Sequence, residues 1–331
     1  TRNVSLGYGS LSSDTEGSRS VAIGTDALFT QNFTSATDAY NTAVGHFAGG
    51  AITTGDRNTL IGGLAGDALN TGAANVAVGY LALTSDTKGS SNVAIGRGAL
   101  HDQNFTTGVD SFNTAVGDRA GESVTTGVQN TIVGGLAGDA LTVGSTNVAL
   151  GVSALGADTK GNSSVAIGSS ALRLQNFTTA TDVYNVAIGR AAGENVTTGT
   201  NNTLIGGLSG DAITTGGSNT SVGAYAMTTL TTGSHNVAVG TSALDVTTTG
   251  SSNVAVGRDA LGANTTASYN TAVGYQSLYT NTTGSVNTAI GNGALYLNTT
   301  GTSNISVGSN SLADNTTGGN NVAVGRDALG N

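Results

Sequence analysis

The chain has 331 residues, including 52 Gly but no Pro, Cys or Trp, and its formal net charge is −9 with only 9% charged residues. The negative charge disfavours nucleic acid as a partner, because such partners require a basic surface. The lack of Cys excludes disulfides and thiolate metal sites, and no apolar run reaches the about 18 residues of a membrane helix. Glycine does not recur at every third position, so the composition is not that of collagen.

One short unit repeats along the chain, and each copy contains a run of the Val-Ala-Val-Gly type. Fifteen of the eighteen intervals between the closing glycines are 17 residues long, and three are 21. Self-similarity at a fixed period predicts a solenoid of stacked coils. The glycines are Gly7, Gly24, Gly45, Gly62, Gly79, Gly96, Gly117, Gly134, Gly151, Gly168, Gly189, Gly206, Gly223, Gly240, Gly257, Gly274, Gly291, Gly308 and Gly325.

The residues before each glycine alternate in size. An aliphatic residue precedes the glycine, a Val, Thr or Ile lies two places earlier, and Ala or Ser lies between them in most coils. This alternation predicts a short strand with two inward side chains per coil. We therefore expect Val256 and Val273 to point inward together with Leu261.

Three coils have a large residue at the strand centre and a glycine where most coils have Leu. We expect the large side chain to fill the volume that the missing Leu leaves. The strand-centre residues are Leu60, Ile132 and Leu204, and the glycines of the same coils are Gly66, Gly138 and Gly210.

The fold class that follows is all-β, a parallel β-solenoid of about nineteen 17-residue coils forming a single repeat domain over residues 1–331. Identical side chains in adjacent coils then lie about 4.8 Å apart. The residue four places before the glycine is nearly always Asn, which predicts a ladder of bonded amides. Ladder members are expected to include Asn75, Asn92, Asn236, Asn253, Asn270 and Asn287.

In chain order, the 21-residue coils span 24–44, 96–116 and 168–188, and each contains a four-residue insertion with the run Gln-Asn-Phe-Thr. An Asp and an aromatic residue follow. Rings, amides and carboxylates together suit contact with glycans; the alternative is a structural bulge whose Phe folds back onto the coil or onto a neighbouring subunit. The glycan or receptor candidates are Phe33, Phe105, Phe177, Asn32, Asn104, Asn176, Tyr40, Phe112 and Tyr184, with Tyr275, Tyr279 and Tyr296 as weaker ones.

Asn-X-Ser/Thr triplets occur at several sites, among them Asn32, Asn104, Asn176, Asn281 and Asn298. In a chain this rich in Asn and Thr, composition alone produces such triplets. They do not by themselves predict glycosylation.

Catalytic patterns are absent from the sequence. The three His residues lie in different columns of the repeat, and Asp67, Asp139 and Asp211 lie four coils apart, so about 19 Å along the axis, too far to share a metal. We expect no catalytic residue, no metal and no cofactor. A polysaccharide lyase on a solenoid would need clustered carboxylates or basic residues in a cleft.

The core expected from these columns is thin, and the small strand-centre residue would let another backbone come close. Both features predict association through one face, and a parallel homotrimer is the favoured arrangement. The start at Thr1 shows no signal peptide, which indicates a processed product or a fragment.

The Asn-Val-Ala-Val-Gly run at 75–79 and the Ser-Val-Ala-Ile-Gly runs at 20–24 and 164–168 resemble head repeats of trimeric autotransporter adhesins. The run at 270–278, with Asn-Thr-Thr-Gly at 281–284, is similar to repeats of phage tail fibres. The resemblance covers essentially the whole chain and implies a left-handed β-roll of three parallel chains. The coil is longer than is usual in adhesin heads, and no stalk, anchor or chaperone domain is present, so adhesin versus tail fibre stays open.

The function expected is therefore a rigid, non-enzymatic segment of a longer extracellular fibre on a bacterial surface or virion. Its partners would be copies of itself and cell-surface glycans, with no nucleic acid and no membrane insertion. The alternative is an ice- or surface-binding solenoid that uses ranks of Thr. Lys88 and Val143 are among the residues that interrupt the outward rank in the first half, so it is continuous only from Thr198 to Thr317.

Overall fold

The computed structural model describes residues 2–330, and these form a parallel β-solenoid of about nineteen turns with a spacing of about 17 residues. Within the described range, no helix is long and apolar enough to span a membrane. The chain divides into two compact units. The first runs to Ser164 and includes Asn176–Asp182, and the second comprises Val165–Gln175 and the residues from Val183 onward.

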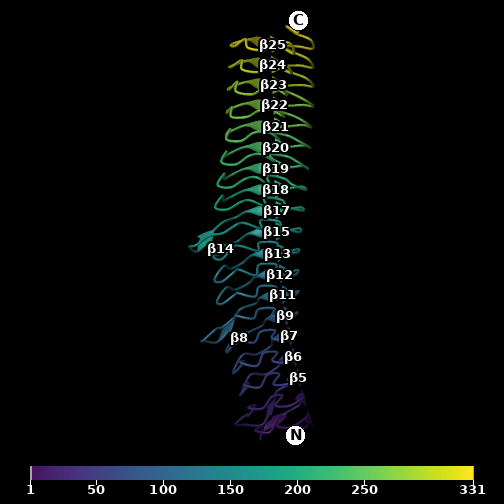
Figure 1. Ribbon diagram of the computed structural model, residues 1–331, viewed down its shortest axis with the longest axis vertical. Helices are drawn as coiled ribbons and strands as arrows, with labels where there is room; N and C mark the ends of the chain where they lie inside the picture. Colours follow the sequence, from purple (N-terminus) through teal and green to yellow (C-terminus); the bar gives the residue numbers. More distant parts are fainter. Residues whose placement is uncertain (1, 331) are drawn as a thin grey trace. The chain divides into compact units, whose positions relative to one another are not determined.

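In the described part of the first unit, nine three-residue strands pair in parallel, each with the equivalent strand of the next coil (Figure 1). They are β1 (Val4–Leu6), β3 (Val21–Ile23), β5 (Thr42–Val44), β6 (Thr59–Ile61), β7 (Val76–Val78), β9 (Val93–Ile95), β11 (Thr114–Val116), β12 (Thr131–Val133) and β13 (Val148–Leu150).

The second unit contains ten such strands in its described residues, paired in the same register. They are β15 (Val165–Ile167), β17 (Val186–Ile188), β18 (Thr203–Ile205), β19 (Thr220–Val222), β20 (Val237–Val239), β21 (Val254–Val256), β22 (Thr271–Val273), β23 (Thr288–Ile290), β24 (Ile305–Val307) and β25 (Val322–Val324).

Each strand ends at a glycine because the chain turns there with a positive φ and meets the next coil closely. At Gly240, φ is +136°, and an added Cβ would lie 2.6 Å from the carbonyl oxygen of Gly257. Only glycine tolerates both conditions. The closing glycine of the repeat is therefore required by the stacking itself.

The direction of the strand side chains is opposite to the one expected from the sequence. From β3 onward the small centre residue is buried, whereas Val256 and Val273 are only half-buried and face outward; Leu261 is fully buried as expected. A period of two fixes that alternate residues share a side but not which side is the interior. The interior of a 17-residue coil is narrow, and Ala at the strand centre leaves room for the Leu that enters from the opposite wall.

The compensation expected at the large strand-centre residues is present. Leu60 is completely buried, and a Cβ added to Gly66 would lie 2.8 Å from its Cδ2 atom. A Cβ added to Gly49, in the preceding coil, would lie 2.7 Å from Cδ1 of the same Leu. One strand-centre Leu thus fills the space over two glycines.

The expected Asn ladder is seen in full geometry at one typical step. Asn75 is buried, and both its backbone N–H and its side-chain Nδ2 donate to Oδ1 of Asn58, at 3.0 and 3.2 Å. Its own Oδ1 accepts from the N–H and Nδ2 of Asn92, at 3.0 and 3.1 Å. The same ladder continues in the second unit through Asn236, Asn253, Asn270 and Asn287.

Candidate functional site

The three insertions form loops at residues 31–41, 103–113 and 175–185 (the insertion loops). They lie beside the stack of three-residue strands (the main ladder). A two-residue strand in each loop pairs in parallel with the corner of the preceding coil. The pairs are β2 (Gly17–Ser18) with β4 (Thr37–Asp38), β8 (Gly89–Ser90) with β10 (Val109–Asp110), and β14 (Gly161–Asn162) with β16 (Thr181–Asp182). In the first unit, β8 and β14 lie on the same side of the ladder (Figure 1).

A buried carboxylate anchors the second loop. Oδ1 of Asp86 accepts hydrogen bonds from the N–H of Gly89 at 2.9 Å and from the N–H of Phe105 at 3.1 Å. Its Oδ2 accepts from Nε2 of Gln103 at 2.6 Å, and Oε1 of Gln103 accepts from Nδ2 of Asn113 at 2.8 Å. Asp86 is completely buried, and these three donors compensate the cost of removing the charge from water.

The other loops use the same parts. In the first, Oδ2 of Asp14 accepts from Nε2 of Gln31 at 2.9 Å, and Oε1 of Gln31 accepts from Nδ2 of Asn41 at 2.8 Å. In the third, Asp158 is buried and its Oδ1 accepts from the N–H of Phe177 at 3.2 Å. In each case the Asp belongs to the preceding coil, whereas the Gln and Asn are the first and last residues of the loop and are bonded to each other.

The structure corrects the expectation for the three Phe rings. Phe33, Phe105 and Phe177 are only 5%, 6% and 7% exposed. Their burial favours the alternative of a bulge whose Phe folds back onto the coil, and the rings cannot serve as a contact surface for glycans. They contribute instead to holding the loops in place, since burying a Phe side chain stabilises by about 1.5–3 kcal/mol.

The remaining candidates of the loops are accessible. Asn32, Asn104 and Asn176 are exposed, as are Tyr40, Phe112 and Tyr184. The three aromatic residues have positive φ values of 51°, 51° and 54°.

In the first loop, the hydroxyl of Tyr40 accepts from Nη1 of Arg19 at 2.6 Å, and the guanidinium carbon lies 5.3 Å from the ring centroid. Among the weaker candidates, Tyr279 and Tyr296 stack with a centroid distance of 5.6 Å.

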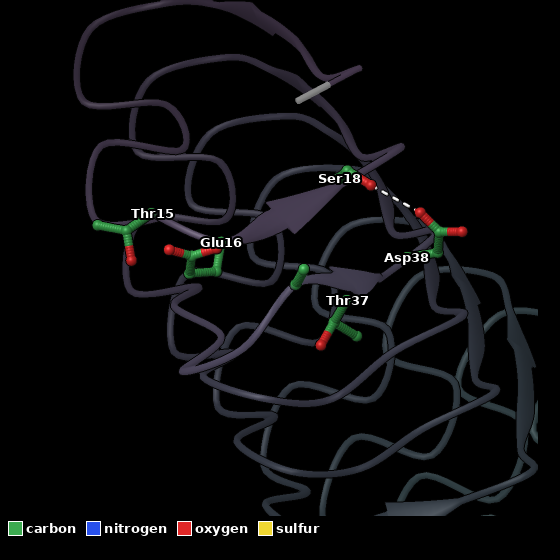
Figure 2. Close-up of a pocket in the computed structure, with 6 residues that line it drawn as sticks. Thr15, Glu16, Ser18, Thr37 and Asp38 are labelled. Carbon is green, nitrogen blue, oxygen red and sulfur yellow. Dashed lines mark hydrogen bonds between the residues drawn. The ribbon is translucent and has the colours of Figure 1, made fainter.

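A hollow of about 370 Å³ adjoins the first insertion loop (Figure 2). Ser18 donates to Oδ1 of Asp38 at 2.7 Å, and Arg19 pairs with the same oxygen at 3.1 Å. The lining is polar and open to solvent, as suits hydroxyl-rich ligands. Its residues are Thr15, Glu16, Ser18, Ala36, Thr37 and Asp38.

The first loop differs in charge from the other two at one position of this hollow. Lys88 and Lys160 occupy the repeat position of Glu16. The first loop therefore has a negative charge beside it where the second and third loops have a positive one.

Carboxylates elsewhere do not combine into a site. Across residues 2–330, no group of three or more His, Asp or Glu is placed to hold a metal ion. Burial raises the pKa of Asp139 and of Asp211, and one side-chain oxygen of Asp211, Oδ1, is buried without a hydrogen-bond partner in the described chain. At the exposed Asp118, by contrast, a hydrogen bond from Arg97 lowers the carboxyl pKa.

Sequence reasoning missed the Asp–Gln–Asn network, although a signal was present. Asp14, Asp86 and Asp158 each precede the Gln of an insertion loop by 17 residues, which is one coil.

In the comparison with known proteins, no protein-family model and no curated protein matches the chain.

Proposed function

We propose that the chain is a structural segment of an extracellular fibre and that it assembles as a parallel homotrimer. The observation that supports this most is the outer face of the main ladder. Two side chains per coil face outward there, the residue directly before the closing glycine and the residue two places earlier. The first is always Val, Ile or Leu and the second is Val, Thr or Ile.

These two columns (the outward columns) contain no charged residue in any coil. Members such as Ile61, Leu150 and Ile290 are about 40% exposed even with their neighbours stacked above and below. Monomeric soluble proteins rarely expose contiguous apolar patches larger than a few hundred Å², and larger patches mark interfaces. Covering the outward columns therefore favours self-association.

Parallel chains suit this surface. When the strand stacks of identical copies run in the same direction, each coil meets its equivalents and the aliphatic side chains remain in register. A rotation axis along the stack generates such an arrangement, with closed cyclic symmetry. The resemblance to adhesin heads and tail fibres supports three copies.

The insertion loops supply the second part of the proposal, contact with cell-surface glycans. The accessible rings of Tyr40, Phe112 and Tyr184 replace the buried Phe residues as the groups that stack on sugars. Repetition of one loop in several coils and several chains provides multivalency, by which weak contacts combine into strong attachment.

Sedimentation equilibrium of the purified chain tests the assembly. We expect three times the chain mass of 32.2 kDa. Replacing Val239, Val256 and Val273 by Lys places three charges on the outward columns and should give folded monomers. The matched control replaces Thr232, Thr249 and Thr266 by Lys. These residues are exposed on another side of adjacent coils, so this variant should remain trimeric. A monomeric parent protein contradicts the proposal.

Binding to ice or another ordered surface is a second candidate, favoured by one observation. Eight Thr at the same coil position are exposed, and no hydrogen bond from their hydroxyls is present within residues 2–330. The corner segments that contain them, from 197–201 to 316–320, carry no Lys, Arg, Asp or Glu. The exposed residues are Thr198, Thr215, Thr232, Thr249, Thr266, Thr283, Thr300 and Thr317.

The neighbouring Thr rank differs, because its hydroxyls bond internally: Thr231 donates to the carbonyl of Thr248 at 3.0 Å, and Thr248 to that of Thr265 at 3.2 Å. Measurement of thermal hysteresis tests the second candidate. A depression of the freezing point that Thr249→Lys abolishes supports it, whereas no hysteresis in the parent protein removes it.

A further inference from the structure

We propose that the insertion loops carry N-linked glycans, attached to Asn32, Asn104 and Asn176. Each of these residues begins an Asn-Phe-Thr triplet, and Asn-X-Ser/Thr is the acceptor pattern for glycosylation on surface loops of secreted proteins. The pattern alone is too frequent in this chain to be informative. The structure distinguishes these three copies from the others.

Thirteen Asn-X-Ser/Thr triplets occur in the sequence, and most of their Asn residues are inaccessible. Five are buried in the solenoid: Asn219, Asn264, Asn281, Asn298 and Asn304. Four are half-buried: Asn3, Asn162, Asn195 and Asn315. Four are exposed: Asn32, Asn104, Asn176 and Asn201.

Hydrogen bonding separates the loop residues further, because glycosylation takes place at Nδ2. In every triplet outside the loops, Nδ2 of the Asn donates a hydrogen bond. Asn281, for example, donates to Oδ1 of Asn264 at 3.0 Å and to the carbonyl of Gly284 at 2.9 Å. Exposed Asn201 donates to the hydroxyl of its neighbour Thr200 at 3.1 Å.

The loop residues show the reverse pattern. Each Oδ1 atom accepts a hydrogen bond from the hydroxyl of the Thr one coil earlier. The distance is 3.0 Å for Asn32 and 3.1 Å for both Asn104 and Asn176. No hydrogen bond from their Nδ2 atoms is present in the part of the chain that the structure describes. The amide is thus held by its oxygen while its nitrogen remains available.

The rest of the triplet is presented in the same way. The middle Phe is buried, whereas the third residue is exposed in all three loops, as Thr34, Thr106 and Thr178. The chain bends at this Thr in each loop, and the Asn and the Thr both lie at the surface. A glycosyltransferase could therefore reach both the Asn and the Thr hydroxyl of the folded loop.

The chemistry requires only an activated sugar. Nδ2 attacks the anomeric carbon of a glycosyl diphosphate, a C–N bond forms, the bond from that carbon to the phosphate oxygen breaks, and the nitrogen loses one proton. The donor is either a nucleotide sugar or a lipid-linked oligosaccharide. No oxidation or reduction takes place.

The inference is independent of self-association, because it uses contacts within one chain only. It also assigns the loop Asn residues a different role from glycan recognition: they carry a sugar covalently. Failure of the trimer in sedimentation would leave it unaffected, and the reverse also holds.

Glycopeptide mass spectrometry of the protein isolated from the cells that naturally produce it tests the inference. We expect sugar increments on the peptides containing Asn32, Asn104 and Asn176, and none on the peptides containing Asn281 and Asn298. A single monosaccharide on each Asn favours transfer from a nucleotide sugar, and one uniform block of several sugars favours transfer from a lipid-linked oligosaccharide.

Two variants sharpen the result. Thr34→Ala keeps Asn32 but destroys its triplet, so the increment at Asn32 alone should disappear. Thr283→Ala is the matched control at the buried Asn281 triplet and should change nothing. Unmodified loop peptides in the native protein overturn the inference, as do increments on the buried Asn281 or Asn298.

Discussion

The coils around the insertion loops and the last coils of the chain solve the same internal problem with different side chains. The residue seven places after each closing glycine (the seventh-position residue) points into the coil. In the last coils it is an Asn that repeats: Nδ2 of Asn281 donates to Oδ1 of Asn264, and Nδ2 of Asn298 donates to Oδ1 of Asn281. Near a loop it is Asp86 followed by Gln103, whose carboxylate and amide are bonded at 2.6 Å.

The two arrangements differ in how donors and acceptors are distributed. In a ladder of identical amides every coil supplies one donor and one acceptor to its neighbours, so these coils are interchangeable. The loop network is directional, because a carboxylate that only accepts must be followed by an amide that donates. The carboxylate can accept further hydrogen bonds from backbone N–H groups, and the N–H of Phe105 in the insertion loop donates one of them.

The largest effect is expected from Asp86→Ala. It leaves the N–H groups of Gly89 and Phe105 and the Nε2 of Gln103 without their acceptor, at about 1–3 kcal/mol for each buried group. The free energy of unfolding should fall by more than about 3 kcal/mol, and hydrogen exchange should show the loop 103–113 losing protection first. An unchanged urea midpoint would mean that the carboxylate does not anchor the loop.

Truncation of the aliphatic core should affect both regions equally. Leu60→Ala, beside the first loop, and Leu278→Ala, in the last coils, each remove a completely buried side chain and should cost ~2–5 kcal/mol. Both losses should fall in this range, because Leu60 fills its coil from the strand side and Leu278 fills the equivalent space of its own coil from the opposite wall. Urea unfolding measures both. A negligible loss for Leu60→Ala alone would refute the compensation.

A smaller effect is expected within the amide ladder. Asn281→Ala removes the acceptor of Nδ2 of Asn298, which keeps the carbonyl of Gly301 as a second acceptor. Because one partner remains, the loss should be about 1–3 kcal/mol and less than that of Asp86→Ala. If the two variants are equally destabilised in thermal melts, the contrast between network and ladder is wrong.

The smallest effect concerns a carboxylate outside both arrangements. Burial, with smaller contributions from Glu194 and Asp245, raises the pKa of Asp211. The folded state then binds the proton more tightly than the unfolded state, so stability falls as pH rises between the unfolded and folded pKa values. Asp211→Asn should therefore stabilise at pH 7, by less than about 1 kcal/mol.

Below about pH 3 the carboxyl is protonated in both states, and the stabilisation by Asp211→Asn should vanish. Thermal melts of both proteins at the two pH values measure the difference. A stabilisation that is larger in acid than at neutral pH would contradict the assignment.

Much of the fold was predictable because the repeat is strict. The period established the solenoid, and the Asn column established the ladder. The inward side of the strand was predicted wrongly, although the column of Asn residues is sufficient to determine it. Asn253 and Ala255 differ by two positions and must share a side, so a buried Asn253 places Ala255 inside and leaves Val254 and Val256 outside.

The same parity explains why the loop site was only partly predicted. Gln31 occupies the seventh position and is buried, so Asn32 is exposed and Phe33 is buried again. The anchoring Asp14 lies one coil earlier and is recognised only when two coils are compared at equal phase. Tyr40 follows the same rule, because it directly precedes the buried Asn41, and the equivalent Tyr269 of a 17-residue coil is also exposed with a positive φ.

Cysteine cross-linking tests the central claim most directly, that the outward columns join parallel chains in register. The chain contains no Cys, so Val256→Cys introduces one thiol on the outward face, and Thr249→Cys introduces one on the exposed Thr rank. In a parallel trimer, equivalent Val256→Cys positions meet near the axis, and mild oxidation should produce covalent dimers of this variant only. Efficient cross-linking of Thr249→Cys with none at Val256→Cys would contradict the account.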